Sequence, residues 1–256
     1  MASRKTGSKY LSGEEGCQPA DRFRVYGLLE LALARFFPPR CLFCLGPGQA
    51  PDLDLCAGGE ADLLPNVPAC TVCAQPLKTA GSFLCPRCAA RPRAFDAAFA
   101  GCRYAWPLDW AVQRAKYSGD IAAAAVLGRL LARRLPALQA AHVDALLPVP
   151  LHRAREAQRG YNQAHEIARQ VGRRLGLPVV SGPFERIRAT PAQAGLDAAA
   201  RRRNLKGAFA RRGPWPYRRV AIIDDVMTTG TTVEALAELL REAGSEWIEV
   251  WVLARA

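Results

Sequence analysis

An apolar strand that runs into two adjacent carboxylates constrains this chain more than any other segment. Residues 220–223 are apolar and mostly β-branched, which is typical of a strand buried on both faces of a parallel sheet. Asp224 and Asp225 follow, and residues 233–244 have the pattern of a helix closed by glycine. The segment therefore predicts an α/β domain with a ligand site at the carboxyl end of this strand.

The loop between the predicted strand and helix contains mainly threonine and glycine. Its central residues are Thr228, Thr229, Gly230, Thr231 and Thr232. Backbone N–H groups and hydroxyls at the positive end of a helix suit a phosphate. The carboxylates would instead accept hydrogen bonds from hydroxyls or hold a divalent cation. A phosphate near a pair of hydroxyls describes a ribose 5-phosphate. The alternative, an aspartate pair that only caps the next helix, explains one carboxylate but not the loop.

Strand, acid pair and threonine loop together resemble the signature of type I phosphoribosyltransferases, which bind phosphoribosyl pyrophosphate (PRPP). The resemblance implies that Asp224 and Asp225 bind the ribose hydroxyls and that Thr228, Thr229, Gly230, Thr231 and Thr232 hold the 5-phosphate. It also implies Mg²⁺ as the cofactor that accompanies PRPP. The fold that it implies is a parallel sheet flanked by helices.

The net charge favours acidic partners, and the amino-terminal segment favours a protein that stays in the cytoplasm. The chain has 256 residues, half of them apolar, and a net charge of +12. That surplus favours phosphorylated metabolites, nucleic acid or an acidic protein, although a compositional bias towards arginine explains it equally well. Residues 1–22 are expected to be a disordered tail and residues 23–38 an amphipathic helix rather than an export signal. No stretch is long and apolar enough to predict a transmembrane segment.

Cysteines recur with a period of 29 residues and predict zinc. Cys70-x2-Cys73 is followed after eleven residues by Cys85-x2-Cys88, and four thiolates at this spacing suit a structural zinc ribbon. Disulfides are the competing interpretation, but nothing places the chain in an oxidising compartment. We therefore expect residues 39–94 to form a small double zinc ribbon and residues 95–256 the phosphoribosyltransferase domain.

The first copy of the repeat lacks one ligand. Cys41, Cys44 and Cys56 match the second copy, but glycine stands at position 59. Three alternatives remain open: a carboxylate supplies the fourth ligand, no metal binds, or the first CxxC pairs with a CxxC of the other copy. The candidate carboxylates are Asp54, Glu60 and Asp62. Cys17 is expected to be a free thiol and Cys102 a buried small residue.

A second anion site is expected before another helix. Residues 145–150 predict a core strand, residues 151–160 a basic loop, and residues from 161 a helix ended by Gly176. In type I phosphoribosyltransferases the equivalent loop binds pyrophosphate, which implies that role for Arg159, Gly160, Asn162 and Gln163. We expect Arg153 and Arg155 to be solvated and His152 to be structural rather than an acid or base.

Residues 186–209 are long, polar and rich in arginine, which favours a mobile lid. The residues that we expect near pyrophosphate are Thr190, Gln193, Arg203 and Asn204. A solvated basic helix over residues 197–205 is the alternative.

The whole series of motifs resembles the ComF/GntX group of phosphoribosyltransferase-like proteins. That resemblance implies a role in natural competence, with single-stranded DNA or DNA-uptake proteins as partners. Three functions fit the sequence: transfer of phosphoribosyl from PRPP to an unidentified acceptor, non-catalytic handling of DNA, or sensing of PRPP or a nucleotide. The acceptor is expected to bind in a pocket formed by residues 95–119, a segment that we call the hood.

Overall fold

A computed structural model describes residues 38–49, 53–78, 81–137, 141–188 and 207–256. The chain divides into two units, Met1–Pro38 and Pro39–Ala256, and everything below concerns the second. The expected tail and amphipathic helix lie outside the described residues, apart from Pro38.

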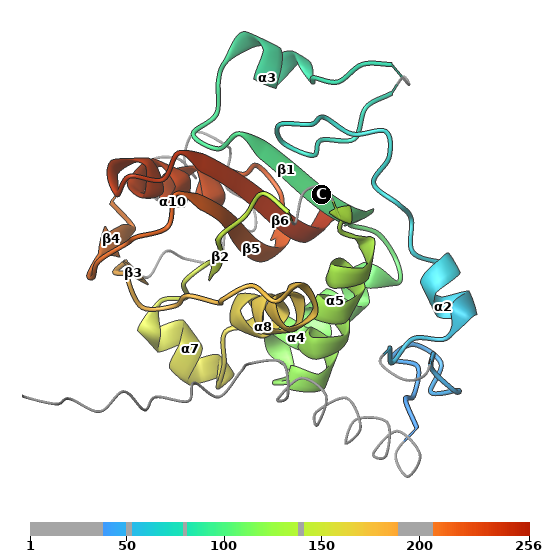
Figure 1. Ribbon diagram of the computed structural model, residues 1–256. Helices are drawn as coiled ribbons and strands as arrows, with labels where there is room; N and C mark the ends of the chain where they lie inside the picture. Colours follow the sequence, from blue (N-terminus) through green and yellow to red (C-terminus); the bar gives the residue numbers. More distant parts are fainter. Residues whose placement is uncertain (1–37, 50–52, 79–80, 138–140, 189–206) are drawn as a thin grey trace, which may run out of the picture. The chain divides into compact units, whose positions relative to one another are not determined.

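The centre of the unit is a parallel sheet of four strands in the order β1-β6-β5-β2 (Figure 1). Its strands are β1 Ala97–Arg103, β6 Trp247–Arg255, β5 Arg219–Met227 and β2 Ala145–Pro148. The predicted signature strand is therefore an inner strand, with Asp224 opposite Val252 of β6. This confirms the expected parallel sheet.

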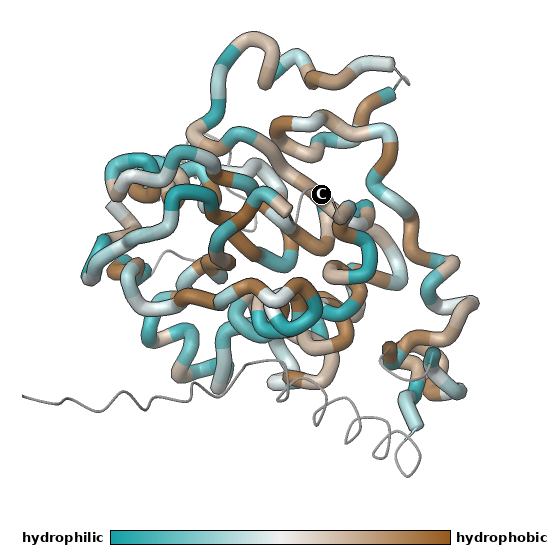
Figure 2. Tube along the Cα trace, in the orientation of Figure 1, coloured by the Kyte–Doolittle hydropathy of each residue, from teal (hydrophilic) through white to brown (hydrophobic). Residues whose placement is uncertain are grey.

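Helices cover both faces of this sheet. On β5, Ala221 and Ile223 pack with the core under α4 Leu108–Tyr117, α5 Ile121–Arg134 and α8 Gln163–Leu175. Val220 and Ile222 point the other way, into the core under α10 Thr231–Glu242. Figure 2 shows hydrophobic stretches within the sheet and a mostly hydrophilic α7 Arg153–Arg159. Burial on both faces explains why the apolar run of β5 is continuous rather than alternating.

One expectation is wrong, and one strand was not expected. The predicted basic loop 151–160 contains helix α7, whose end at Gly160 (φ 84°) uses the left-handed conformation that glycine favours. Residues 95–119, where the hood is expected, contain helix α4 and also β1, an edge strand of the core sheet that the sequence analysis did not predict. Small residues in β1 give a weak strand signal, which is why the sequence did not reveal it.

The remaining elements are small. Strands β3 Phe184–Arg186 and β4 Phe209–Arg211 pair antiparallel at the two ends of the lid segment. Short helices α2 Ala57–Ala61 and α3 Pro86–Ala90 belong to the cysteine-rich region. The expected lid residues 189–206 lie outside the described residues.

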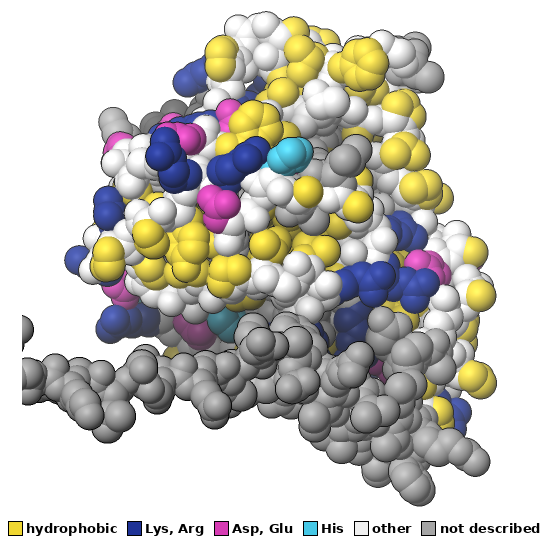
Figure 3. Space-filling view, viewed as in Figure 1, with side chains coloured by type: hydrophobic (Ala, Val, Ile, Leu, Met, Phe, Trp, Pro, Cys, Tyr) yellow, Lys and Arg dark blue, Asp and Glu magenta, His cyan; other side chains and the backbone are white. Residues whose placement is uncertain are grey.

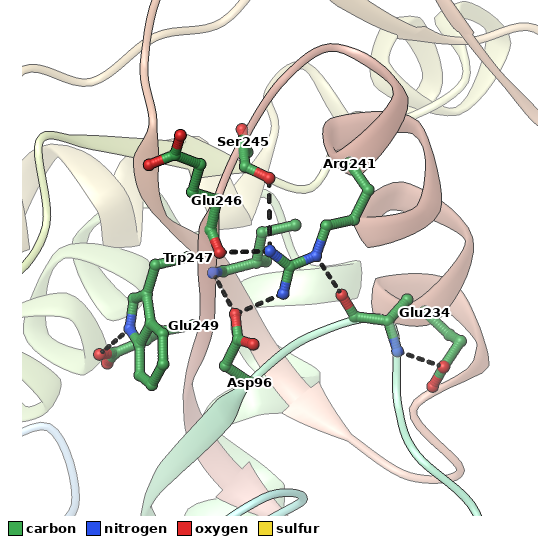
Figure 4. Close-up of polar contacts among 9 residues, drawn as sticks. Asp96, Glu234, Arg241, Ser245, Glu246, Trp247 and Glu249 are labelled. Atoms are coloured by element: carbon green, nitrogen blue, oxygen red, sulfur yellow. Dashed lines mark hydrogen bonds and ion pairs between the residues drawn. The ribbon is translucent and has the colours of Figure 1, made fainter.

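The end of α10 is fixed to the edge of the sheet by Arg241 (Figure 4). Its guanidinium donates to the carbonyl of Ala94 at 3.1 Å and to Asp96 Oδ2 at 2.5 Å. It also donates to the carbonyls of Ser245 and Glu246, the turn that leads into β6. One side chain thus joins α10, β1 and β6.

Replacing Arg241 with alanine should lower the free energy of unfolding by roughly 2 kcal/mol, because several partly buried acceptors lose a charged donor together. Urea denaturation measures this change. As a control, Arg153→Ala removes an 86% exposed side chain with one ion pair and should change stability by less than about 0.5 kcal/mol. Equal effects of the two substitutions would contradict the bridging role of Arg241.

Candidate functional site

A cavity of about 690 Å³ lies where β2 and β5 end, at their carboxyl edge. It brings together both predicted aspartates, two of the predicted threonines and two of the predicted anion-binding residues. Its polar lining is Tyr104, Lys116, Tyr117, Arg155, Gln158, Arg159, Gln163, Arg186, Asp224, Asp225, Thr228 and Thr232. Segments far apart in the sequence therefore contribute to one hollow.

The two aspartates point to opposite faces of β5 because successive strand residues alternate. Asp225 is 3% exposed, and its Oδ2 lies 2.9 Å from Lys116 Nζ of α4. Its Oδ1 accepts from the N–H of Val226 at 2.7 Å. Asp224 Oδ1 accepts from the N–H of Asp225 at 2.9 Å, and this side chain keeps some exposure along the cavity. Both carboxylates reach the edge of the cavity although they lie on opposite faces of β5.

Lys116 is a site residue that sequence reasoning missed. It follows no anion-binding pattern, and only its position on α4 brings it to β5. Burial lowers the pKa of Lys116, but the charges of Asp225 and Asp224 outweigh burial and raise it above the usual value. The ammonium therefore stays charged.

Asp224 has the most altered acidity of the site. Burial and then repulsion from Asp225 raise its pKa to about 7, against the pull of Lys116. The pair therefore loses its last proton near neutral pH. An acid that titrates in this range can exchange a hydrogen bond with a ligand hydroxyl in either protonation state.

The threonine loop turns directly into α10. Gly230 adopts φ 77° as the N-cap residue and has no side chain to cap the helix, while Thr229 Oγ1 accepts from the N–H of Thr231 at 3.4 Å. Thr229 and Thr231 hydroxyl oxygens lie 2.7 Å apart. Thr228 is exposed, and Thr228 and Thr232 line the cavity. The other N–H groups at this end of α10 lie beside hydroxyl groups, an arrangement that suits an anion.

The second predicted anion site is only partly assembled at the cavity. Arg159 Nη1 donates to Gln163 Oε1, and both residues line the cavity. Gly160 forms the turn between α7 and α8. Asn162 instead caps α8: it accepts from the N–H of Ala164 at 3.0 Å and donates to the carbonyl of Val149 at 3.0 Å. The structure therefore gives Asn162 a structural task.

Two further cations line the cavity. Arg155, which we expected to be solvated, is half-buried there, so that expectation is wrong; its place on α7 turns it inwards. Arg186 at the end of β3 is 8% exposed, and burial together with the nearby charge of Arg155 lowers its pKa. Arg153 is exposed, as expected, and its guanidinium pairs with Glu185 at 2.8 Å.

His152 caps α7 by accepting from the N–H of Ala154 at 3.3 Å, in line with the structural role expected for it. The predicted lid residues Thr190, Gln193, Arg203 and Asn204 lie outside the described residues.

The cysteines form two separate clusters, each of sulfurs within 4.8 Å of one another. One contains Cys70, Cys73, Cys85 and Cys88, and the other contains Cys41, Cys44 and Cys56. Pairing of CxxC units between the two copies is therefore excluded. Cys102 is buried, and burial raises its pKa to about 11.

Comparison with known proteins gives the family. A double zinc ribbon model matches residues 32–90, and a phosphoribosyl transferase domain model matches residues 157–256. Competence protein F of Haemophilus influenzae is 35% identical over 88% of this chain and 100% of its own length. The chain belongs to the ComF family. DNA utilization protein YhgH is 34% identical in Escherichia coli O157:H7 and 33% in Salmonella typhimurium, over 85% of this chain and 97% of each relative.

Membership of the ComF family and the thiol clusters together support structural zinc. Four clustered thiols fit a tetrahedral Zn²⁺ and leave no coordination position for a substrate. Within the described residues, no helix is both long and apolar enough to cross a membrane.

Two arginines connect the region of the four-thiol cluster to the threonine loop. Arg93 pairs with Glu234 Oε2 at 2.6 Å in the first turn of α10, and against the effect of burial the charge of Glu234, helped by the nearby Cys88 thiol, raises the pKa of Arg93. Arg255 donates to the carbonyl of Cys73 at 3.2 Å and to the carbonyl of Met227 at 2.9 Å. One partly buried and one buried guanidinium group thus join the ribbon to both ends of the loop.

The raised pKa of Asp224 predicts a loss of stability with rising pH. Its ordinary pKa is 3.8 and its folded pKa is about 7, so the folded state binds more protons between these values. The free energy of unfolding should fall across this window, by up to about 4 kcal/mol. In Asp224→Asn this contribution disappears, so the variant should gain on the wild type as pH rises. Urea denaturation at several pH values checks this, and a constant difference between the two proteins would count against it.

Proposed function

We propose that this cavity binds PRPP and that the protein transfers the phosphoribosyl group to an acceptor. One observation supports this above all: a single hollow contains an acid pair, a threonine loop at a helix N-terminus and three arginines. These three groups match the three parts of the ligand, which are a diol, a terminal phosphate and a pyrophosphate.

Each group has a task in the proposed complex. Asp224 and Asp225 accept hydrogen bonds from the ribose hydroxyls. The loop from Thr228 to Thr232 donates backbone N–H and hydroxyl groups to the 5-phosphate. The third task, binding pyrophosphate, falls to Arg155, Arg159 and Arg186.

Transfer breaks the bond between C1 of the ribose and the pyrophosphate oxygen, whose electron pair leaves with pyrophosphate. A positively charged sugar centre develops, and the acceptor nucleophile forms the new bond at C1. The arginines stabilise the negative charge on the leaving group, while the acids and the loop hold the sugar still. The carboxylates also fit Mg²⁺, which, when bound, would screen the charge on pyrophosphate. Among the described residues, Asp224 and Asp225 are the only acids that line the cavity.

Lys116 has a positioning role in this proposal. Its ammonium offsets the charge of buried Asp225 before ligand arrives and holds that carboxylate at the cavity edge. A neutral side chain at this position would leave an uncompensated buried charge.

The biological setting that we propose comes from the relatives, whose names are Competence protein F and DNA utilization protein YhgH. We propose that this protein also serves DNA uptake or use. Zinc-binding thiols need a reducing environment, which favours action in the cytoplasm. Handling of single-stranded DNA without catalysis, or sensing of PRPP or a nucleotide, is the alternative function.

Calorimetry with PRPP and Mg²⁺ tests the site. Asp225→Asn should weaken binding at least about tenfold, because the hydroxyl acceptors lose their charge and Lys116 loses its partner. Arg153→Ala is the control, since that residue lies on α7 but does not line the cavity. No heat with the wild type, or equal affinities for wild type and Asp225→Asn, would reject the site. Release of pyrophosphate with candidate acceptors then separates transfer from sensing.

Fluorescence anisotropy tests the alternative that the protein handles single-stranded DNA. Labelled single-stranded DNA is bound and then displaced by increasing amounts of unlabelled DNA. On the face shown in Figure 3, Lys and Arg side chains stand in separate groups, several beside acidic ones. We therefore expect weak binding that falls with salt between about 50 and about 200 mM and is unchanged in Asp225→Asn. Tight binding abolished by Asp225→Asn would instead place DNA in the cavity itself.

A further inference from the structure

The two cysteine clusters are copies of one structure that differ at one position. The bridge between Arg40 and Pro47 recurs 29 residues later between Ala69 and Pro76. Leu45 and Ala74, again 29 residues apart, share a positive φ of 60° and 53°. The chain therefore follows the same path in both copies.

Gly59 occupies the place that Cys88 has in the second copy. Cys56 and Cys85 are the N-cap residues of α2 and α3, so Gly59 and Cys88 are each the third residue of a short helix. In the second copy this position supplies the fourth sulfur of the cluster.

A side chain at position 59 would point at the three thiols. A Cβ built there lies 3.2 Å from Cys41 Sγ and 3.5 Å from Cys56 Sγ, with the Phe43 ring at 3.1 Å. The Gly59 N–H also donates to Cys56 Sγ at 3.2 Å. The glycine therefore keeps the backbone of a metal knuckle while it removes one ligand.

No nearby carboxylate takes over this position. Asp54 is held by the N–H of Arg40 at 3.2 Å and by Arg129 at 3.0 Å. Glu60 accepts from Gln49 Nε2 at 2.8 Å. Of the described residues, none of the three candidate carboxylates, Asp62 included, joins the cluster. The cluster is open to solvent at Cys44, which is exposed, whereas Cys41 is fully buried.

We propose that Cys41, Cys44 and Cys56 bind a second Zn²⁺ and that its fourth ligand comes from solution, as water or a small thiol. Three protein thiolates with one open position differ from the closed four-thiolate site, because the open position gives competing ligands direct access to the metal. The zinc held by three protein thiolates should therefore exchange readily, and the zinc held by four should not. This inference is independent of PRPP binding.

Zinc content and zinc release of the full-length protein test the proposal. The wild type should contain two zinc ions and release them to the chelator pyridylazoresorcinol in two phases. Removing only a residue that hydrogen-bonds to a metal ligand already lowers metal affinity roughly 10–100-fold. Because the first cluster lacks a ligand itself, the first phase of release should be at least about tenfold faster than the second. The fast phase should be lost in Gly59→Cys, which then holds two slowly released ions.

Cys88→Gly is the matched reciprocal variant, because it should convert the closed site into a second open one with two fast ions. Replacement of zinc by Co²⁺ adds a spectroscopic measurement: mercaptoethanol should shift the absorption bands of the wild type but not those of Gly59→Cys. This second measurement keeps the test valid if Cys88→Gly does not fold.

Two results would overturn the proposal. A wild type that holds one zinc, with two in Gly59→Cys, would show that three thiolates do not retain the metal. Two slow ions in the wild type would show that the chain itself supplies the fourth ligand. Cys17→Ser then tests one source, since Cys17 lies outside the described residues.

Discussion

The ion pair between Lys116 and Asp225 is the interaction on which the site depends. Two adjacent carboxylates at the end of an inner strand are costly to bury, and one cation from α4 compensates one of them. The other responds by holding its proton up to about neutral pH. Tyr161 keeps α4 in place, because its hydroxyl lies within hydrogen-bonding distance of the carbonyls of Ala115 and Asp120, on either side of the α4–α5 turn, and can donate to either. The position of α4 therefore determines the protonation of the two aspartates at the end of β5.

Sequence alone predicted the parts of the site that are contiguous. Strand, acid pair and threonine loop lie within one short segment, and each has a local chemical reason. The residues that were missed or misjudged, Lys116, Arg155 and Arg186, come from three other elements and reach the cavity only through tertiary packing. No pattern in the sequence distinguishes them from solvated cations. The edge strand β1 was missed for a similar reason, since its small residues gain their strand conformation from pairing with β6.

The cysteine repeat was predicted more fully, because ligand spacing is a local property. Spacing identified both clusters and the missing ligand, but not which CxxC units pair. The structure settles the pairing because each cluster closes within its own copy. It also shows why the carboxylates near the first cluster are unsuited to replace a thiolate: Asp54 and Glu60 are already engaged by arginine and amide groups.

Arg93 and Arg255 give the ribbon a consequence beyond its own stability. Arg93 connects the cysteine-rich region to the start of α10, and Arg255 of β6 connects it to the end of β5, so the two side chains hold both ends of the loop that follows β5. A polypeptide made while metal is scarce would lose the rigid backing of that loop, and the binding of PRPP that we propose would weaken. Zinc supply and the occupancy of the neighbouring cavity would then rise and fall together.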